Sequence, residues 1–232
     1  MSFEFPKEME KYWFGNSPFK THLLNSLTLL LPDIEKYLIF NVNQRLKLIE
    51  NPELLQTGKA FIGQEAQHSL QHTKFWENLR ASGYKIDLYL RCLKAVLFKA
   101  LANPLNNQFN LAISAGIEHL TTLFAEFALE ENFLQEAEPT LKNLFEWHAV
   151  EEIEHKSVVF DVLQNSTRSY LVRLLGLVIS HLLVLVFLNL GLVMLLYQDK
   201  KLLDKKVWQE MIQFWLTQEK VLFRVLFNAL KY

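Results

Sequence analysis

The chain has 232 residues and a formal charge of −1, and half of its residues are hydrophobic. This length accommodates one sizeable core, or one bundle with an appendage. The nearly neutral charge provides no basic field that would favour a nucleic-acid partner. Cys92 is the only cysteine, which excludes an internal disulfide and is compatible with a reducing compartment. Seven glycines, six prolines and few β-branched runs favour long helices over a sheet.

Prolines predict where the first two long helices begin. Pro32 and the acidic residues just after it are typical of a helix start, because proline suits the first turn and acids there meet the positive end of the helix dipole. We expect this helix over about 32–49. Pro52 predicts the start of a second helix over about 52–81.

Three further stretches carry apolar residues at the three- and four-residue spacing of helices. They cover about 86–102, 105–134 and 139–164. Together with the first two, they predict an all-α fold: a ferritin-like four-helix bundle with additional helices, which occupies residues 1–167.

The segment from Leu174 to Tyr197 has 24 residues and no acidic, lysine or arginine side chain. As a helix it would extend about 36 Å, enough to cross a hydrocarbon core of about 30 Å. Basic residues flank it on both sides, so its orientation stays open. The alternatives are a transmembrane helix, or a buried helix or a hairpin broken near Gly176 or Gly191 that docks on the bundle. If one face of the helix meets lipid, we expect His181 and Asn189 to turn toward protein instead.

The last segment, about 205–232, combines aromatic and basic residues and predicts an amphipathic helix on a membrane or on the bundle. With the apolar helix it forms a C-terminal unit over 168–232. The N-terminal residues lack the basic-then-apolar order of a signal peptide. We therefore expect a protein on the cytoplasmic side, in contact with the inner membrane. A homo-oligomer is the alternative that would cover the apolar face.

Glutamate and histidine recur along the predicted bundle in a pattern that binds metal. Two Glu-x-x-His pairs lie on separate helices, and residues three apart share one helix face, about 5 Å from each other, so both can reach one ion. Single glutamates on two other helices complete the ligand set of a two-metal carboxylate bundle. The predicted ligands are Glu35, Glu65, His68, Glu118, Glu152 and His155.

Two further histidines, His72 and His148, lie one turn from these pairs on the same helix faces. Because the helices that carry the pairs run antiparallel in a ferritin-like bundle, we expect both histidines level with each other, one turn above the metals. They are candidates for extra ligands or for groups that orient the ligands. The alternative is a pair of structural histidines bonded to nearby carboxylates. Glu151 points off the ligand face and is expected to be solvated or to orient a ligand.

Three segments that carry these residues resemble the motifs of a bacterial family of predicted metal-dependent hydrolases: 63–68, 117–121 and 147–156. The resemblance extends over most of the chain, and the last block is its most specific part. It implies a bound metal. More distantly, the ligand pattern is similar to that of ferritin-like di-iron oxygenases and oxidases.

A mixed Glu/His site suits iron or manganese, and carboxylates that bridge two ions support redox cycling and activation of O₂. We therefore expect two metal ions, iron in the first place with manganese or zinc as alternatives. The favoured function is an oxygenase or oxidase that acts on an apolar or lipid-like substrate and takes electrons from a donor. The alternatives are a hydrolase in which two metals activate water, and a non-enzymatic metal-binding protein at the membrane.

Overall fold

The computed structural model of the protein describes residues 1–6 and 8–229, and within these residues it contains helices and no strand. The α-helices are α1 (Pro18–Leu46), α2 (Pro52–Ala81), α3 (Asp87–Ala95), α4 (Asn107–Glu130), α5 (Pro139–Glu154), α6 (Val158–Ser166), α7 (Tyr170–Gln198), α8 (Lys205–Ile212) and α9 (Val221–Ala229). Two π-helical turns and one 3₁₀ turn join them: η1 (Val96–Ala102), η3 (Gln213–Thr217) and η2 (Phe133–Glu136). The predicted all-α fold is confirmed.

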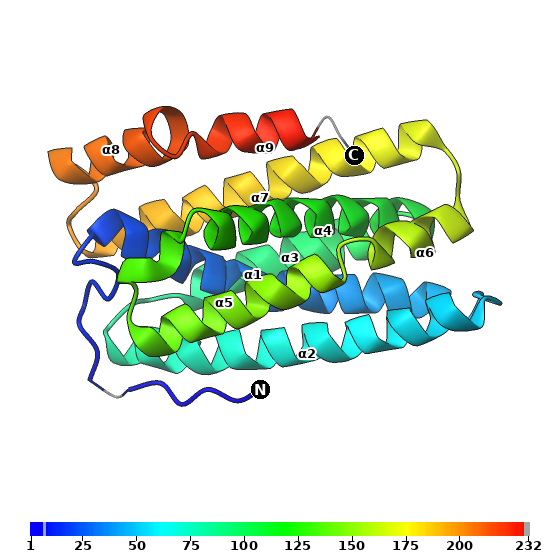
Figure 1. Ribbon diagram of the computed structural model, residues 1–232, viewed down its shortest axis with the longest axis horizontal. Coiled ribbons are helices and arrows are strands. Elements are labelled where there is room, and N and C mark those ends of the chain that lie inside the picture. Colours follow the sequence, from blue (N-terminus) through cyan, green and yellow to red (C-terminus); the bar gives the residue numbers. More distant parts are fainter. Residues whose placement is uncertain (7, 230–232) are drawn as a thin grey trace.

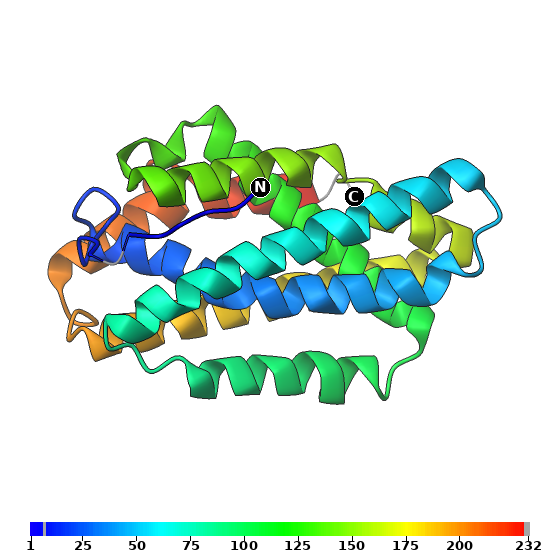
Figure 2. The same cartoon turned by 90° about the horizontal axis from the view of Figure 1, so that it is seen from below.

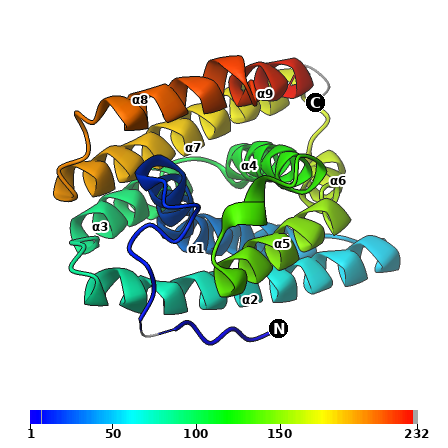
Figure 3. The same cartoon turned by 60° about the vertical axis from the view of Figure 1, so that its left-hand side comes forward.

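Four helices, α1, α2, α4 and α5, run along the long axis of the molecule (Figure 1). α2 returns antiparallel to α1 after a short loop, whereas the chain passes from α2 to α4 through α3 and η1 on one side of the bundle (Figure 2). Seen obliquely, the four helices surround a common interior, with α7 on one side and with α8 and α9 as an outer layer (Figure 3). This is the predicted four-helix bundle with additional helices.

The first helix begins earlier than the sequence predicts. α1 starts at Pro18, and the side chain of Ser17 caps it by accepting a hydrogen bond from the Lys20 backbone N–H. The predicted start at Pro32 is therefore wrong, although the rule behind it holds at Pro18, which supplies the proline of the first turn.

Pro32 lies inside α1, where it has no N–H to donate to the Thr28 carbonyl one turn back. The indole N–H of Trp76 on α2 donates to this carbonyl instead, at 3.0 Å. The Ser69 hydroxyl, also on α2, donates to the Pro32 carbonyl at 3.1 Å. Because α2 satisfies the backbone groups that proline disturbs, the helix continues into the turn that carries Glu35.

The segment 139–164 is divided into α5 and α6, and not the single helix that its apolar spacing predicts. The division follows His155, which caps α5. Its ring is held from two other helices: Nδ1 lies 2.6 Å from Glu118 Oε1 on α4, and the ring packs edge-on against Phe61 of α2 with centroids 4.9 Å apart. The break therefore coincides with a side chain that is fixed by non-local contacts.

α7 packs on α4 and α1 through close backbone approach at two glycines. A Cβ atom at Gly176 would lie only 2.6 Å from the backbone carbon of Ala112 on α4, and one at Gly191 would clash with the hydroxyl of Ser26 on α1. Only glycine permits helices to come this close. The division of the chain into units after residue 167 stays a prediction.

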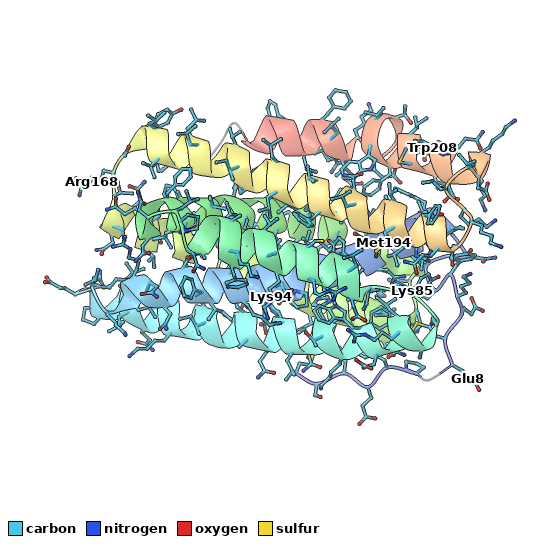
Figure 4. All side chains as sticks on the ribbon, turned by 180° about the vertical axis from the view of Figure 1, so that it is seen from behind. Glu8, Lys85, Lys94, Arg168, Met194 and Trp208 are labelled. Carbon is cyan, nitrogen blue, oxygen red and sulfur yellow. The ribbon has the colours of Figure 1, made fainter. Side chains whose placement is uncertain are left out.

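The opposite face of α7 is exposed. Among the described residues, α7 is the one helix long and apolar enough to cross a membrane. Only 28% of the apolar stretch that could cross it is buried in the protein. Arg168 lies near one end of this helix and Trp208 beyond the other, with α3 alongside (Figure 4). Of the two polar residues expected to face protein, His181 is partly buried, whereas Asn189 does not face protein. It is exposed, and its amide donates to the Leu185 carbonyl at 2.7 Å, within its own helix.

The predicted amphipathic segment 205–232 forms α8, η3 and α9, and its residues 230–232 lie outside the described residues. Its inner face buries Val207 and Phe214, whereas Trp208 and Ile212 are exposed on the outer face. This segment therefore presents apolar side chains both to the bundle and to the surroundings.

The Trp76→Phe substitution tests how Pro32 is accommodated. It removes the donor to the Thr28 carbonyl and leaves a buried acceptor unpaired, so we expect the free energy of unfolding to fall by about 1–3 kcal/mol in chemical denaturation. Trp208→Phe makes the same change at an exposed site and should alter stability by no more than about 0.5 kcal/mol. Pro32→Ala restores a backbone donor to this carbonyl, so Trp76→Phe should cost less in that background. Equal costs in both backgrounds would contradict the explanation.

Candidate metal centre

The predicted ligands converge inside the bundle from all four of its helices. α1 and α4 each contribute one glutamate, α2 contributes a Glu-x-x-His pair, and α5 contributes a glutamate and the histidine that caps it. Each residue is buried, with at most 3% of its surface exposed. The six residues are Glu35, Glu65, His68, Glu118, Glu152 and His155.

Two groups of ligand atoms lie close enough to hold an ion each. The first comprises one atom from each member of the two Glu-x-x-His pairs, all within 4.8 Å of one another: Glu65, His68, Glu152 and His155. The second, by the same measure, comprises Glu35, His68 and His148. Because His68 belongs to both groups, the two groups adjoin. Glu118 and His72 lie in neither, although each touches a member.

Glu118 and Glu151 each hold one of the histidines in place. Glu118 Oε1 lies 2.6 Å from His155 Nδ1, and Glu151 Oε2 lies 3.0 Å from His68 Nε2. When these nitrogens donate to the carboxylates, the other nitrogen of each ring keeps a free lone pair that faces the interior. Such carboxylate–histidine pairs fix the tautomer and orientation of a metal-binding ring.

His72 and His148 lie level with each other, as their sequence offsets predict. His72 Nε2 is 3.0 Å from His148 Nδ1, and His72 Nδ1 is 3.2 Å from the Thr28 hydroxyl. His148 also stacks on the His68 ring, with centroids 4.0 Å apart, and its Nε2 lies 3.9 Å from Glu35 Oε1. The two histidines therefore differ: His148 faces the ligand groups directly, and His72 contacts them through His148.

Burial and mutual repulsion act on the carboxylates. Burial, and next the charge of Glu152, raise the pKa of Glu35 and Glu65 well above its usual value and the pKa of Glu118 to about 7. For Glu152 burial acts in the same direction, but the hydrogen bond and charge of His148, the charge of His155 and the Thr121 hydrogen bond together outweigh it and lower its pKa. The neighbouring protein groups thus supply too little positive charge to neutralise all four buried carboxylates.

Several buried atoms of the predicted ligands have no hydrogen-bond partner. Both carboxylate oxygens of Glu35 and of Glu65 have no hydrogen-bond partner, and neither has Glu118 Oε2. The same holds for His68 Nδ1 and His155 Nε2, the two nitrogens left by the carboxylate–histidine pairs. Buried carboxylates without partners are costly, so this donor set fits bound cations. Glutamate and neutral histidine suit transition-metal ions.

Two polar residues here orient ligands. The Thr121 hydroxyl, which was not predicted to do so, donates to Glu152 Oε2 at 2.6 Å, and it lies one turn after Glu118 on α4. Glu151, predicted either to be solvated or to orient a ligand, receives a second hydrogen bond, from the Trp147 indole at 2.6 Å, which fixes it beside His68. The position of Thr121 one turn from a ligand is the only sequence signal that could have identified it.

Comparison with known proteins agrees with this geometry. The whole chain, residues 1–232, matches a family described as "Predicted metal-dependent hydrolase". No curated protein and no solved structure matches the chain. The chain therefore belongs to this family of predicted metal-dependent hydrolases.

The family corrects the function favoured by the sequence patterns. An oxygenase or oxidase is contradicted, because the family is one of hydrolases. What stands is a metal-dependent enzyme with a buried Glu/His cluster. The preference for redox chemistry rested on the mixed Glu/His ligand set, and that ligand set is shared by enzymes of both kinds, so it could not decide between them.

Substitution of Glu65 should change stability with opposite signs in the absence and presence of metal. Because burial raises the pKa of Glu65 above 4.5, the folded state binds its proton more tightly than the unfolded state, and the metal-free protein loses stability as pH rises above this value. The stability of metal-free Glu65→Gln relative to metal-free wild type should therefore increase as the pH rises from about 5 to about 8. With metal added, Glu65→Gln should be the less stable protein.

Thermal denaturation after chelation and after addition of zinc measures both signs. Glu77→Gln, on the exposed surface of the same helix, is the matched control and should follow wild type. A Glu65→Gln protein whose stability relative to wild type does not change with pH would refute the electrostatic account.

Proposed function

We propose that this protein is a hydrolase that works with two metal ions held at the candidate metal centre. The family description supports hydrolysis, and the two adjoining ligand groups with their unpartnered buried atoms support two ions. When bound, two ions supply a nucleophilic water at neutral pH and polarise the bond that it attacks. The proposed ligands are Glu35, Glu65, His68, Glu118, His148, Glu152 and His155.

The chain's own residues orient these ligands and keep bulk water away. Glu118 holds His155 through Oε1, which leaves Oε2 for an ion. Thr121 fixes the Glu152 carboxylate. Phe61 packs edge-on against His155, and Trp147 packs against His68 with centroids 4.8 Å apart. Ligands held in this way need little rearrangement when they bind.

Histidine and carboxylate donors suit iron, manganese and zinc. Hydrolysis requires no change in the oxidation state of the metal, and an electron donor has no role in it. Zinc, which is redox-inert, is therefore the ion that separates this proposal from redox chemistry.

Metal removal and replacement test the proposed function. Chelated protein should lose activity on p-nitrophenyl esters, and zinc added in the absence of oxygen should restore it. Glu65→Gln should weaken zinc binding about tenfold or more, measured by competition with a chromogenic chelator, because it removes a negative ligand. Glu77→Gln should leave zinc binding unchanged. Turnover that requires oxygen and a reductant, with no hydrolysis by the zinc-loaded protein, would contradict the proposal.

We further propose that the protein contacts the membrane on its cytoplasmic side through α7. Its outer face carries a row of exposed side chains that includes Leu174, Leu182, Val186 and Leu190. Soluble monomers rarely expose an apolar strip of this length. Exposed Tyr170 and Tyr197 lie at the two ends, where interface tyrosines occur, and basic residues follow on both sides.

The contacts of α7 favour docking over insertion as an isolated span. Gly176 and Gly191 fit closely against α4 and α1, and the helix buries side chains such as Leu192 and Leu195 against the bundle. Removing α7 from the bundle would expose these faces. We therefore propose that α7 contacts lipid with its outer face while its inner face stays packed.

Fractionation and liposome binding test this contact. The full-length protein should sediment with membranes and resist a high-salt wash, and the purified protein should bind liposomes. The double substitution Val186→Glu and Leu190→Glu should weaken binding because it places charges in an apolar contact. Leu48→Glu, exposed at the end of the bundle away from this face, is the control. A detergent-free dimer that the double substitution converts into monomers would favour a second copy and contradict membrane contact.

A further inference from the structure

An apolar cavity of about 90 Å³ adjoins the candidate metal centre. Its polar lining consists of Thr121, His148 and Glu152, which all belong to the centre or hold it. The other side chains that line it are aliphatic or aromatic. The cavity thus has one polar end, formed by two proposed metal ligands and Thr121. Its other walls are apolar and cannot form an ion pair with a charged group.

The lining residues show in which direction the cavity extends. On α4 they run from Thr121 to Ala128, which is about 10 Å along the helix at 1.5 Å per residue. On α5 they run backwards from Glu152 to Phe145, and on α1 from Leu31 to Leu23. Because α4 is antiparallel to α1 and α5, all three sets extend toward the same end of the bundle (Figure 1).

The π-helical turn η3 contributes to the wall of the cavity at the end away from the metal centre. Phe214 is buried, and its ring packs against Phe127 and Phe133 with centroids 5.9 and 5.4 Å apart. Trp215 follows it in the cavity wall and is only half-buried. π-helical turns are frequent at functional sites, and this one lies where the outer segment meets the bundle (Figure 3).

We propose that this cavity binds the apolar acyl chain of the substrate, with its carbonyl group beside Thr121, His148 and Glu152. This rests on the hydrolase function proposed above and names its substrate class: carboxylic esters with a short, uncharged acyl chain. Water adds to the acyl carbon, the bond from this carbon to the ester oxygen breaks, and the departing oxygen takes up a proton to give acid and alcohol.

Two physical limits define this class. A charged chain would be buried without a partner, which is costly. The volume is smaller than the roughly 150 Å³ of an apolar cavity that binds benzene, so a long chain requires Trp215 to move. The chain is therefore a short hydrocarbon.

Ligand binding tests the cavity without any catalysis. Terminally brominated propanol is neutral, matches the chain length of a butyrate ester and places a heavy-atom quencher at the end of a short chain. It should quench part of the tryptophan fluorescence saturably, with and without metal, and unbrominated propanol should compete. Trp215→Phe should abolish the saturable part, whereas Trp208→Phe, on the outer face of α8, should preserve it. The absence of saturable quenching in wild type, or its persistence in Trp215→Phe, would overturn the proposal.

The Ala128→Phe substitution tests the direction of the cavity. It fills the end away from the metal centre and should weaken binding of brominated propanol about tenfold or more. With the zinc-loaded protein, it should move the preferred p-nitrophenyl ester from butyrate toward acetate. Ala81→Leu, exposed at the end of α2, adds apolar volume elsewhere and should change neither.

These measurements separate the two proposals. Saturable quenching without hydrolysis of any ester would support the cavity as a binding site and contradict the hydrolase function. Hydrolysis whose chain-length preference is the same in wild type and Ala128→Phe would support the hydrolase function and overturn the cavity as the acyl site.

Discussion

The structure depends on placing four carboxylates, those of Glu35, Glu65, Glu118 and Glu152, inside an apolar bundle. A buried ionised carboxylate without a partner is costly, and here repulsion among the four adds to this cost. Positive charge must therefore be supplied beside these four carboxylates, which lie at the same position along the bundle axis. This requirement also fixes the helix register, since a shift of one residue turns a side chain by about 100° and would carry its carboxylate away from the others.

The histidines complete the centre because each contacts a neighbouring polar side chain. Glu118 fixes His155, Glu151 fixes His68, and His72 contacts His148. In the first two pairs the hydrogen bond uses one ring nitrogen and directs the other toward Glu65, without a hydrogen-bond partner of its own. The break between α5 and α6 belongs to the same arrangement, because it follows the residue that α4 and α2 hold in place.

Local patterns in the sequence predicted most of the helices and the convergence of the Glu-x-x-His pairs, because helical spacing alone decides which residues share a face. The errors have non-local causes. Pro32 looked like a helix start because its compensating donor, Trp76, lies on the next helix. The sequence left open whether Glu151, which points off the ligand face of α5, is solvated or orients a ligand, because its partner nitrogen on His68 lies on α2. Redox and hydrolytic chemistry could not be separated, because both use this ligand set.

The C-terminal segments contribute to the centre although they carry none of the proposed ligands. Leu188 of α7 and Phe214 of η3 line the cavity that adjoins Glu152. Without them this side of the bundle would be open, and water would replace the apolar wall next to the carboxylate. Close packing at the glycines of α7 holds the wall in place. The low-dielectric surroundings that strengthen every interaction at the centre therefore depend on helices that also present an apolar outer face.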